Sequence, residues 1–197
     1  MHDPGLGAPA IILAAALLAS GPAQAQIESA YTKLDLEGSC TVLDQPAEDE
    51  GGEWIDLLCA GYKGFPVFFS EGDLRQSVHY GFPPPGGTVW ESFGSFNSVS
   101  DTIEWRLLDG RPFATIHRWT IDPDGVQVLV VEKVGQPGIG EGCVAAYVLA
   151  SGNPDANVQA RAAADRLFSG FDCASDTPVR IEGSVPLPPT MIDRSGN

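Results

Sequence analysis

Four cysteines restrict the fold of this 197-residue chain more than any other feature of its sequence. They are Cys40, Cys59, Cys143 and Cys173. An even number of cysteines in an exported chain favours disulfides, and four cysteines allow three different pairings. No two of them have the C-x-x-C spacing of zinc ribbons and thioredoxin-like redox sites, which argues against both kinds of site.

The N-terminal segment predicts that the chain is exported. Residues 8–19 form an apolar run too short to cross a bilayer as a helix, and small residues follow at Ala23 and Ala25, as signal peptidase prefers. No Lys or Arg precedes the run, so either the signal is atypical or the true start lies upstream. A buried N-terminal helix is the alternative. We expect a signal peptide over residues 1–25, a periplasmic or secreted protein, and no membrane insertion after cleavage.

The chain is strongly acidic, with 26 Asp and Glu residues against 11 Lys and Arg residues and a net charge of −15. Removal of residues 1–25 takes away Asp3 and no basic residue, which leaves 25 acids against 11 bases and a net charge of −14. Such a surface repels nucleic acid and anionic membranes and attracts cationic proteins. The same charge also serves solubility, so charge alone does not establish a partner.

The sequence predicts one domain over residues 26–173, followed by a tail over residues 174–197. The tail contains the segment VPLPP, which favours an extended or disordered path. Within the domain, Asp109-Gly110 separates two β-like runs and predicts a two-residue hairpin. Further β-like runs cover 126–134 and 143–150, so we expect an antiparallel meander of about four strands.

Alternation along the hairpin predicts which of its side chains are buried. When Leu108 is placed opposite Arg111, apolar residues share one face and polar residues share the other. The apolar face then holds Ile103, Trp105, Ala114 and Ile116. The polar face holds Glu104, Arg106, Thr115 and His117. This polar face is expected to be half-exposed, and an acid–base cluster on it is the less favoured interpretation.

A helix is predicted over residues 154–168. Asn153 is a suitable N-cap, and Pro154 suits the first helical position. Apolar residues then recur at helical spacing, with Arg161 on the other side, toward water. The apolar stripe comprises Ala160, Ala163, Ala164, Leu167, Phe168 and Phe171.

The lengths of strand and helix predict the disulfide pairing. The strand that starts at Cys143 runs about 23 Å outward, and the helix returns by about 22 Å, which brings Cys173 back to Cys143. Cys40 and Cys59 flank a polar loop between two strand-like segments, so they are expected to pair as well. The expected fold class is α+β: an antiparallel meander with one C-terminal helix packed on a face, and two disulfides.

The cysteine-led strand, the helix start NPDAN and the closing cysteine resemble a group of small exported proteins of Gram-negative bacteria, most of them uncharacterised. The resemblance covers residues 143–173 and, loosely, residues 31–40. It implies no activity.

The chain lacks the local motifs of common catalytic and metal sites. Neither GxSxG nor HExxH is present, and with His2 in the signal only His79 and His117 remain. DPDG at 122–125 begins like a calcium loop, but Lys133 occupies the place of the ligating glutamate. The glycine-rich stretch 135–142 is interpreted as a flexible loop between strands. We therefore expect no catalytic residue that the sequence can identify, no metal and no cofactor.

Weak candidates for ligand binding lie in the aromatic stretch 79–96, namely His79, Tyr80, Trp90 and Phe93. If exposed, they form a platform for a glycan or a peptide, and if buried, they complete the core. The preferred function is a non-catalytic envelope protein that binds a partner, in concrete form an acidic inhibitor of a cationic cell-wall hydrolase. The alternative is an enzyme that acts on envelope glycans, which close paired carboxylates beside Trp90 would favour.

Overall fold

The expected α+β class is wrong, because the protein is mostly β. A computed structural model describes residues 26–47, 49, 51–167 and 170–193, and strands account for 52% of these described residues against 7% for helix. The signal peptide expected over residues 1–25 lies outside the described residues. The difference arises mainly in residues 40–80, where the short strands pair with one another into a second sheet that the meander did not include.

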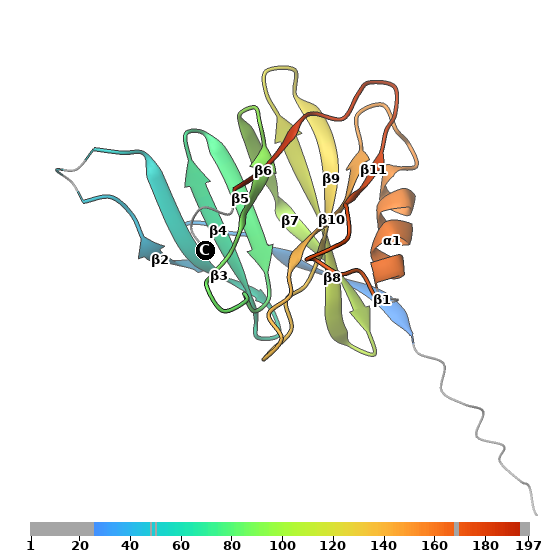
Figure 1. Cartoon of the computed structure of the whole chain (residues 1–197), viewed down its shortest axis with the longest axis horizontal. Helices are drawn as coiled ribbons and strands as arrows, with labels where there is room; N and C mark the ends of the chain where they lie inside the picture. Colours follow the sequence, from blue (N-terminus) through green and yellow to red (C-terminus); the bar gives the residue numbers. More distant parts are fainter. Residues whose placement is uncertain (1–25, 48, 50, 168–169, 194–197) are drawn as a thin grey trace, which may run out of the picture.

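The larger sheet has six strands in the order β1-β7-β8-β9-β10-β11 (Figure 1). These strands are β1 (Ile27–Lys33), β7 (Asn97–Leu108), β8 (Arg111–Ile121), β9 (Val126–Lys133), β10 (Cys143–Leu149) and β11 (Val179–Ile181). Neighbours are antiparallel except β10 and β11, which run parallel. The strands expected between 101 and 150 therefore form the centre of this sheet.

The smaller sheet joins four consecutive strands by antiparallel pairing. They are β2 (Cys40–Asp44), β3 (Trp54–Tyr62), β4 (Phe65–Gly72) and β5 (Arg75–Tyr80). A two-stranded ribbon pairs β6 (Trp90–Phe93) with β12 (Thr190–Asp193). Residues 174–193 thus return to the domain through β11 and β12, and Leu187 between them is only 6% exposed.

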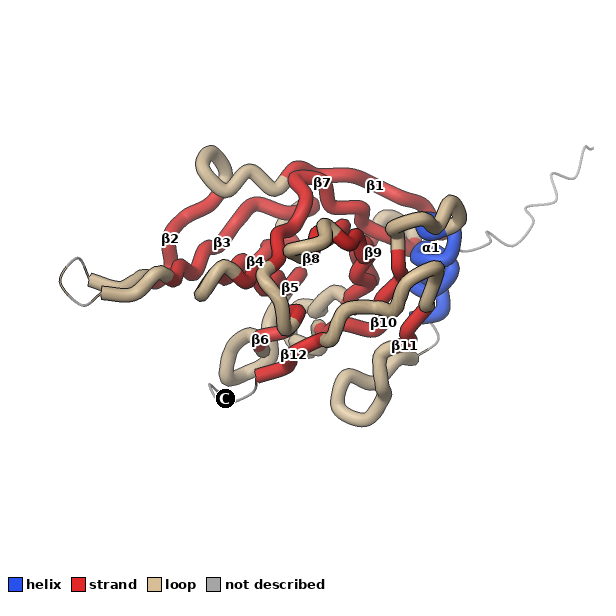
Figure 2. Tube along the Cα trace, turned by 90° about the horizontal axis from the view of Figure 1, so that it is seen from above, coloured by secondary structure: helices blue, strands red, loops and turns tan. Residues whose placement is uncertain are grey.

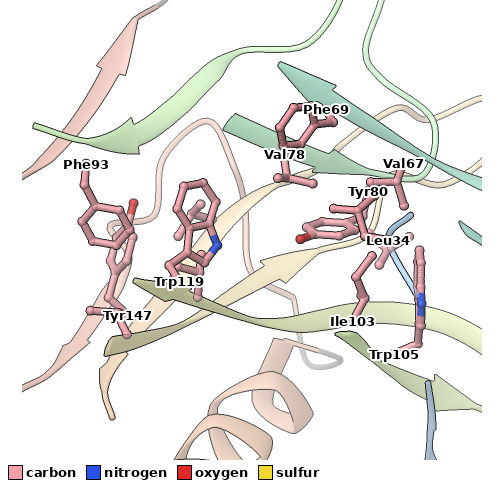
Figure 3. Close-up of a cluster of buried hydrophobic side chains, with 14 of the residues drawn as sticks. Leu34, Val67, Phe69, Val78, Tyr80, Phe93, Ile103, Trp105, Trp119 and Tyr147 are labelled. Carbon is pink, nitrogen blue, oxygen red and sulfur yellow. The ribbon is translucent and has the colours of Figure 1, made fainter. Parts of the chain in front are cut away.

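The main core lies between the two sheets, where aromatic side chains meet (Figure 3). Tyr80 of the smaller sheet approaches Trp105 of the larger sheet edge-on, with ring centroids 5.8 Å apart. Phe93 and Trp119 form a second contact at 5.5 Å. Buried aromatic rings of this size remove large apolar areas from water. Apolar burial therefore holds the sheets together, and Figure 2 shows the strands surrounding this common interior.

A β-bulge in the central hairpin overturns the expected faces of its strands. Leu108 pairs with Arg111 as predicted, but the register then shifts, so that Arg106 pairs with Ala114. Phe113 is the extra residue in β8. A shift of one residue exchanges the two faces of a strand from that point on.

The bulge places His117 and Thr115 in the interior with Trp105, while Glu104 and Arg106 lie on the face covered by the helix. His117 is 1% exposed, so it does not lie on a half-exposed face. The expected grouping of Glu104, Arg106 and His117 on one face is therefore wrong.

Both predicted disulfides are confirmed. Cys40 lies directly opposite Cys59 in the β2–β3 pair, and Cys143 at the start of β10 is bonded to Cys173 beyond the helix. They bridge sequence separations of 19 and 30 residues. Loops of this size predict a stabilisation of about 3 kcal/mol for each bond.

Helix α1 (Ala156–Leu167) packs on the outer face of the larger sheet through small side chains. The predicted stripe is confirmed as far as Leu167, and Phe168 lies outside the described residues. The buried residues of the helix are Ala156, Ala160, Ala163 and Ala164. Because alanine side chains are short, the helix backbone can lie close to β9 and β10.

Two ion pairs fasten the helix to β7. Arg161 Nε lies 2.7 Å from Glu104 Oε1, and Arg106 donates two hydrogen bonds of 2.8 Å to Asp165. Ser29 of β1 links the pairs by donating to Glu104 and accepting from Arg106. Burial raises the pKa of Glu104, but hydrogen bonds from Arg161 and Ser29 outweigh it and hold the pKa below its usual 4.5. The expectation that Arg161 points to water is therefore wrong.

We predict that Arg161→Ala lowers the free energy of unfolding by about 1–3 kcal/mol, because it leaves a buried carboxylate without its hydrogen-bonding cation. Val158→Ala is the matched control, since Val158 lies on the same helix and is 66% exposed. The control should change the free energy by no more than about 0.5 kcal/mol. Denaturant unfolding measures both, and equal midpoints for the two variants would contradict the ion-pair docking.

Candidate functional site

The four candidate ligand-binding residues do not form one surface. Tyr80 and Phe93 are each 1% exposed and belong to the core between the sheets (Figure 3). Trp90 is half-buried at the start of β6, near Gly72 of β4. His79 lies on the opposite face of β5 from Tyr80, because successive side chains of a strand alternate. The structure therefore separates the stretch into two core residues, a half-buried tryptophan, and a histidine that is 6% exposed on the other face of β5.

His79 borders a hollow of about 350 Å³ on the outer side of the smaller sheet. The other walls are Glu91 of β6, the loop residues 140–142, and the Cys143–Cys173 disulfide with Asp172 beside it. Segments far apart in the sequence thus meet here, and the disulfide holds two of them together.

The glycine-rich stretch 135–142 closes one side of the hollow by close backbone packing. Gly135 donates to the Tyr80 carbonyl at 2.8 Å, and its own carbonyl accepts from Phe82 N at 3.0 Å, which bridges the two sheets. A Cβ on Gly142 would lie 2.4 Å from His79 Cε1, closer than any side chain allows. Glycine is therefore required at 142 for the loop to cover the histidine.

The ionisable side chains at the hollow carry negative charge or none at neutral pH. Burial lowers the pKa of His79 from 6.5 to about 4, against an opposing hydrogen bond to the Phe82 backbone, so its imidazole is neutral. Hydrogen bonds from Ser175 and the Ala174 backbone lower the pKa of Asp172, which is ionised. Among the described residues that line the hollow there is no Lys or Arg, and Lys133 beside it is paired with Glu141. The hollow is therefore suited to a cationic group.

The carboxylates at the hollow already hold parts of the structure in place. Glu91 accepts a hydrogen bond of 2.9 Å from Val144 N, and Glu141 pairs with Lys133 at 2.8 Å. Asp172 accepts from Ala174 N at 2.9 Å and from Ser175 Oγ at 2.7 Å. Their positions are thus fixed before any ligand arrives, which reduces the entropic cost of binding.

A second polar group lies inside the core, behind the hollow. Glu132 of β9 is 2% exposed, and its Oε2 has no hydrogen-bond partner among the described residues. Burial raises the pKa of this carboxyl well above 4.5, and the charge of Glu91 adds to the effect. Glu132 is not among the site residues expected from the sequence, although a lone acid in the apolar run VQVLVVEKV was a signal for it.

His117 is also held neutral in the core. Its Nδ1 lies 2.5 Å from the Tyr80 hydroxyl and its Nε2 lies 2.6 Å from the Ser100 carbonyl. A carbonyl can only accept, so Nε2 carries the proton and Nδ1 accepts from Tyr80. Burial lowers the pKa of His117 to about 4, against the opposing hydrogen bond to Ser100.

The buried Glu132 lies apart from the hollow. Burial raises the pKa of Glu132, but this carboxyl does not line the hollow, so a substrate there would not reach it. Within the part of the chain that the structure describes, no three His, Cys, Asp or Glu side chains are grouped as a metal site. Nor is any described helix long and apolar enough to cross a membrane.

Comparisons of the chain with protein-family models, with curated proteins and with solved structures give no match. Its function must therefore be argued from its own geometry and charge.

The buried ionisable groups predict how stability depends on pH. The folded-state pKa of His79 and of His117 is depressed, so their stabilising effect is complete above pH 6.5 and is lost as the pH falls through about 4. Glu132 acts in the opposite sense, because its pKa is raised. The contribution of Glu132 to stability is complete below pH 4.5 and is lost as the pH rises from there.

We predict that Glu132→Gln steepens the loss of stability between pH 6.5 and 4.5, because the two histidines then act without opposition. At about pH 8 the variant should be more stable than the wild type, in which folding must keep a proton on Glu132. Denaturant unfolding across this range measures both effects, with the exposed Glu141→Gln as control. Parallel curves for wild type and Glu132→Gln would refute the proposed protonation of Glu132.

Proposed function

We propose that this chain is a non-catalytic envelope protein, periplasmic or secreted, that binds a cationic partner protein. Its most concrete form is an acidic inhibitor of a cationic cell-wall hydrolase. Export is part of the proposal and rests on the signal peptide expected over residues 1–25. The two disulfides are consistent with an oxidising compartment outside the cytoplasm.

The observation that carries the proposal is the acidic hollow beside His79. Glu91, Glu141 and Asp172 surround it; Lys133 pairs with Glu141 beside it, and the neutral imidazole of His79 adds no positive charge. The net charge of −14 for residues 26–197 adds a field that draws in basic proteins over longer distances. Local and global charge thus favour the same kind of partner.

A Lys or Arg side chain of the partner fits the chemistry of the hollow. Its charged head would meet the carboxylates, while its methylene stem would pack on apolar walls such as Pro84 and Val89. Charged hydrogen bonds to positioned carboxylates are stronger than neutral ones. A basic side chain inserted here would therefore anchor a partner that the general charge has attracted.

The glycan-acting enzyme is the less well supported alternative. Glu91 follows Trp90 in β6, but its carboxylate accepts from the backbone of β10, and Glu132 lies buried away from the hollow. A glycosidase needs two carboxyl groups that both reach the scissile bond. Release of reducing ends from peptidoglycan by the purified protein would favour the enzyme over the binding protein.

We predict that a basic cell-wall hydrolase such as lysozyme binds the mature protein, and that Glu91→Gln accelerates its dissociation. Glutamine keeps an acceptor for Val144 N but removes the charge. Asp109→Asn is the matched control, since it removes the same charge at a hairpin turn outside the hollow. Surface-capture kinetics measure dissociation, which is where most differences in affinity arise.

Salt gives a second measurement in the same experiment. The screening length falls from about 8 Å at 0.15 M to about 3 Å at 1 M salt, so association should slow across this range. Absence of binding by any member of a panel of basic hydrolases at low salt would overturn the proposal. Equal rates of hydrolase dissociation from Glu91→Gln and Asp109→Asn would show that the hollow does not take part in binding.

A further inference from the structure

Strand β2 leaves one edge of the smaller sheet open. It pairs with β3, and within the described residues no strand pairs with its other edge (Figure 1). Each residue from Thr41 to Asp44 is exposed, including Val42 at 49% and Leu43 at 53%. An open edge of this kind is a template for a strand from another chain.

The register shows which backbone groups face outward. Ser39 O accepts from Ala60 N at 3.1 Å, so positions 39 and 60 form a hydrogen-bonded pair. Pairs alternate along an antiparallel ladder, and Cys40 and Val42 therefore occupy non-hydrogen-bonded positions opposite Cys59 and Leu57. Their N–H and C=O groups point away from β3, toward the open edge.

The edge is cross-linked to β3, and it is exposed from Thr41 onward, after the half-buried Cys40. The Cys40–Cys59 disulfide ties β2 to β3, so a partner need not order it on binding. Natural edges are commonly protected by Lys, Pro or a bulge. Here the bulge comes only after Val42, and Pro46 follows the end of the strand.

The charge around this edge selects the occupant. Among the described residues between Cys40 and Cys59 there are four acids, Asp44, Asp49, Glu53 and Asp56, and no Lys or Arg. Asp44 and Asp56, both described, face each other across the β2–β3 pair. A second copy of this chain would bring a matching set of acids to the edge, and like charges oppose such pairing. A basic strand would instead be attracted.

We propose that an extended basic segment of the partner protein adds to β2 as a further strand of the smaller sheet. The proposal rests on the function proposed above, since it names the surface and the binding mode for the cationic partner. Backbone hydrogen bonds to Cys40 and Val42 give the strand its register. The exposed side chain of Val42 and the described acids Asp44 and Asp56 select apolar and basic residues.

The first test uses a capped heptapeptide of alternating valine and lysine. Calorimetry should show binding to the wild-type protein, and amide exchange should slow at Cys40 and Val42. The control peptide has the same sequence with every second backbone nitrogen methylated, which keeps its charge and prevents strand pairing. Equal binding of both peptides, or unchanged amide exchange at Val42, would overturn the proposal. This test needs only the wild-type protein.

The second test changes the edge itself. Val42→Pro removes an outward N–H, which an edge strand tolerates, while Val42→Ala shortens the side chain and keeps the N–H. Proline should weaken peptide binding about tenfold, as expected for the loss of a backbone hydrogen bond and of close approach. Alanine should weaken it less. Equal affinities for Val42→Pro and the wild type would contradict the edge as the site.

A basic hydrolase separates this proposal from the function on which it rests. If lysozyme binds the wild type and Val42→Pro equally well, a cationic partner is recognised elsewhere and the edge proposal alone fails. If neither the hydrolases nor the peptide bind the wild type, both proposals fail. Weaker binding of hydrolase and peptide to Val42→Pro than to Val42→Ala supports both.

Discussion

The extra residue in the central hairpin decides what is inside this protein. Because Phe113 bulges out of the β7–β8 ladder, His117 and Thr115 turn toward the smaller sheet and Glu104 and Arg106 turn toward the helix. Without that bulge, Ala114 and Ile116 would share a face with Ile103 and Trp105, and Thr115 and His117 would share a face with Glu104 and Arg106. The interior and the helix-covered face therefore both depend on one backbone irregularity.

The two faces of the larger sheet are stabilised in different ways. On the inner face, aromatic rings from both sheets are buried together, and among them lie His117, whose pKa burial lowers, and Glu132, whose pKa burial raises. On the outer face, a helix with alanines at its contact depends on ion pairs between Arg161 and Glu104 and between Arg106 and Asp165. Short side chains bury little area, so charged hydrogen bonds supply part of what a larger apolar stripe would give.

The hollow and the open edge belong to one face of the smaller sheet. Thr41 pairs with Leu58, Leu58 with Phe68, and Phe68 with His79, so this row crosses the sheet from β2 to the hollow. Phe68 and His79 are in contact, with ring centroids 6.2 Å apart. A single partner that lays a strand along β2 can therefore also reach the acidic hollow. The two proposed sites are compatible with one binding surface.

The sequence alone determined the local units that cross-links and periodicity define. Strand and helix lengths placed Cys143 beside Cys173, and helical spacing identified the alanine face of α1, because both depend only on residues near one another in the chain. The tertiary structure decided the fold class, the faces of β7 and β8, and the meeting of His79 with residues 140–143 and 172–173. A bulge leaves no mark in an alternating pattern, and contacts between distant strands depend on packing that no local pattern encodes.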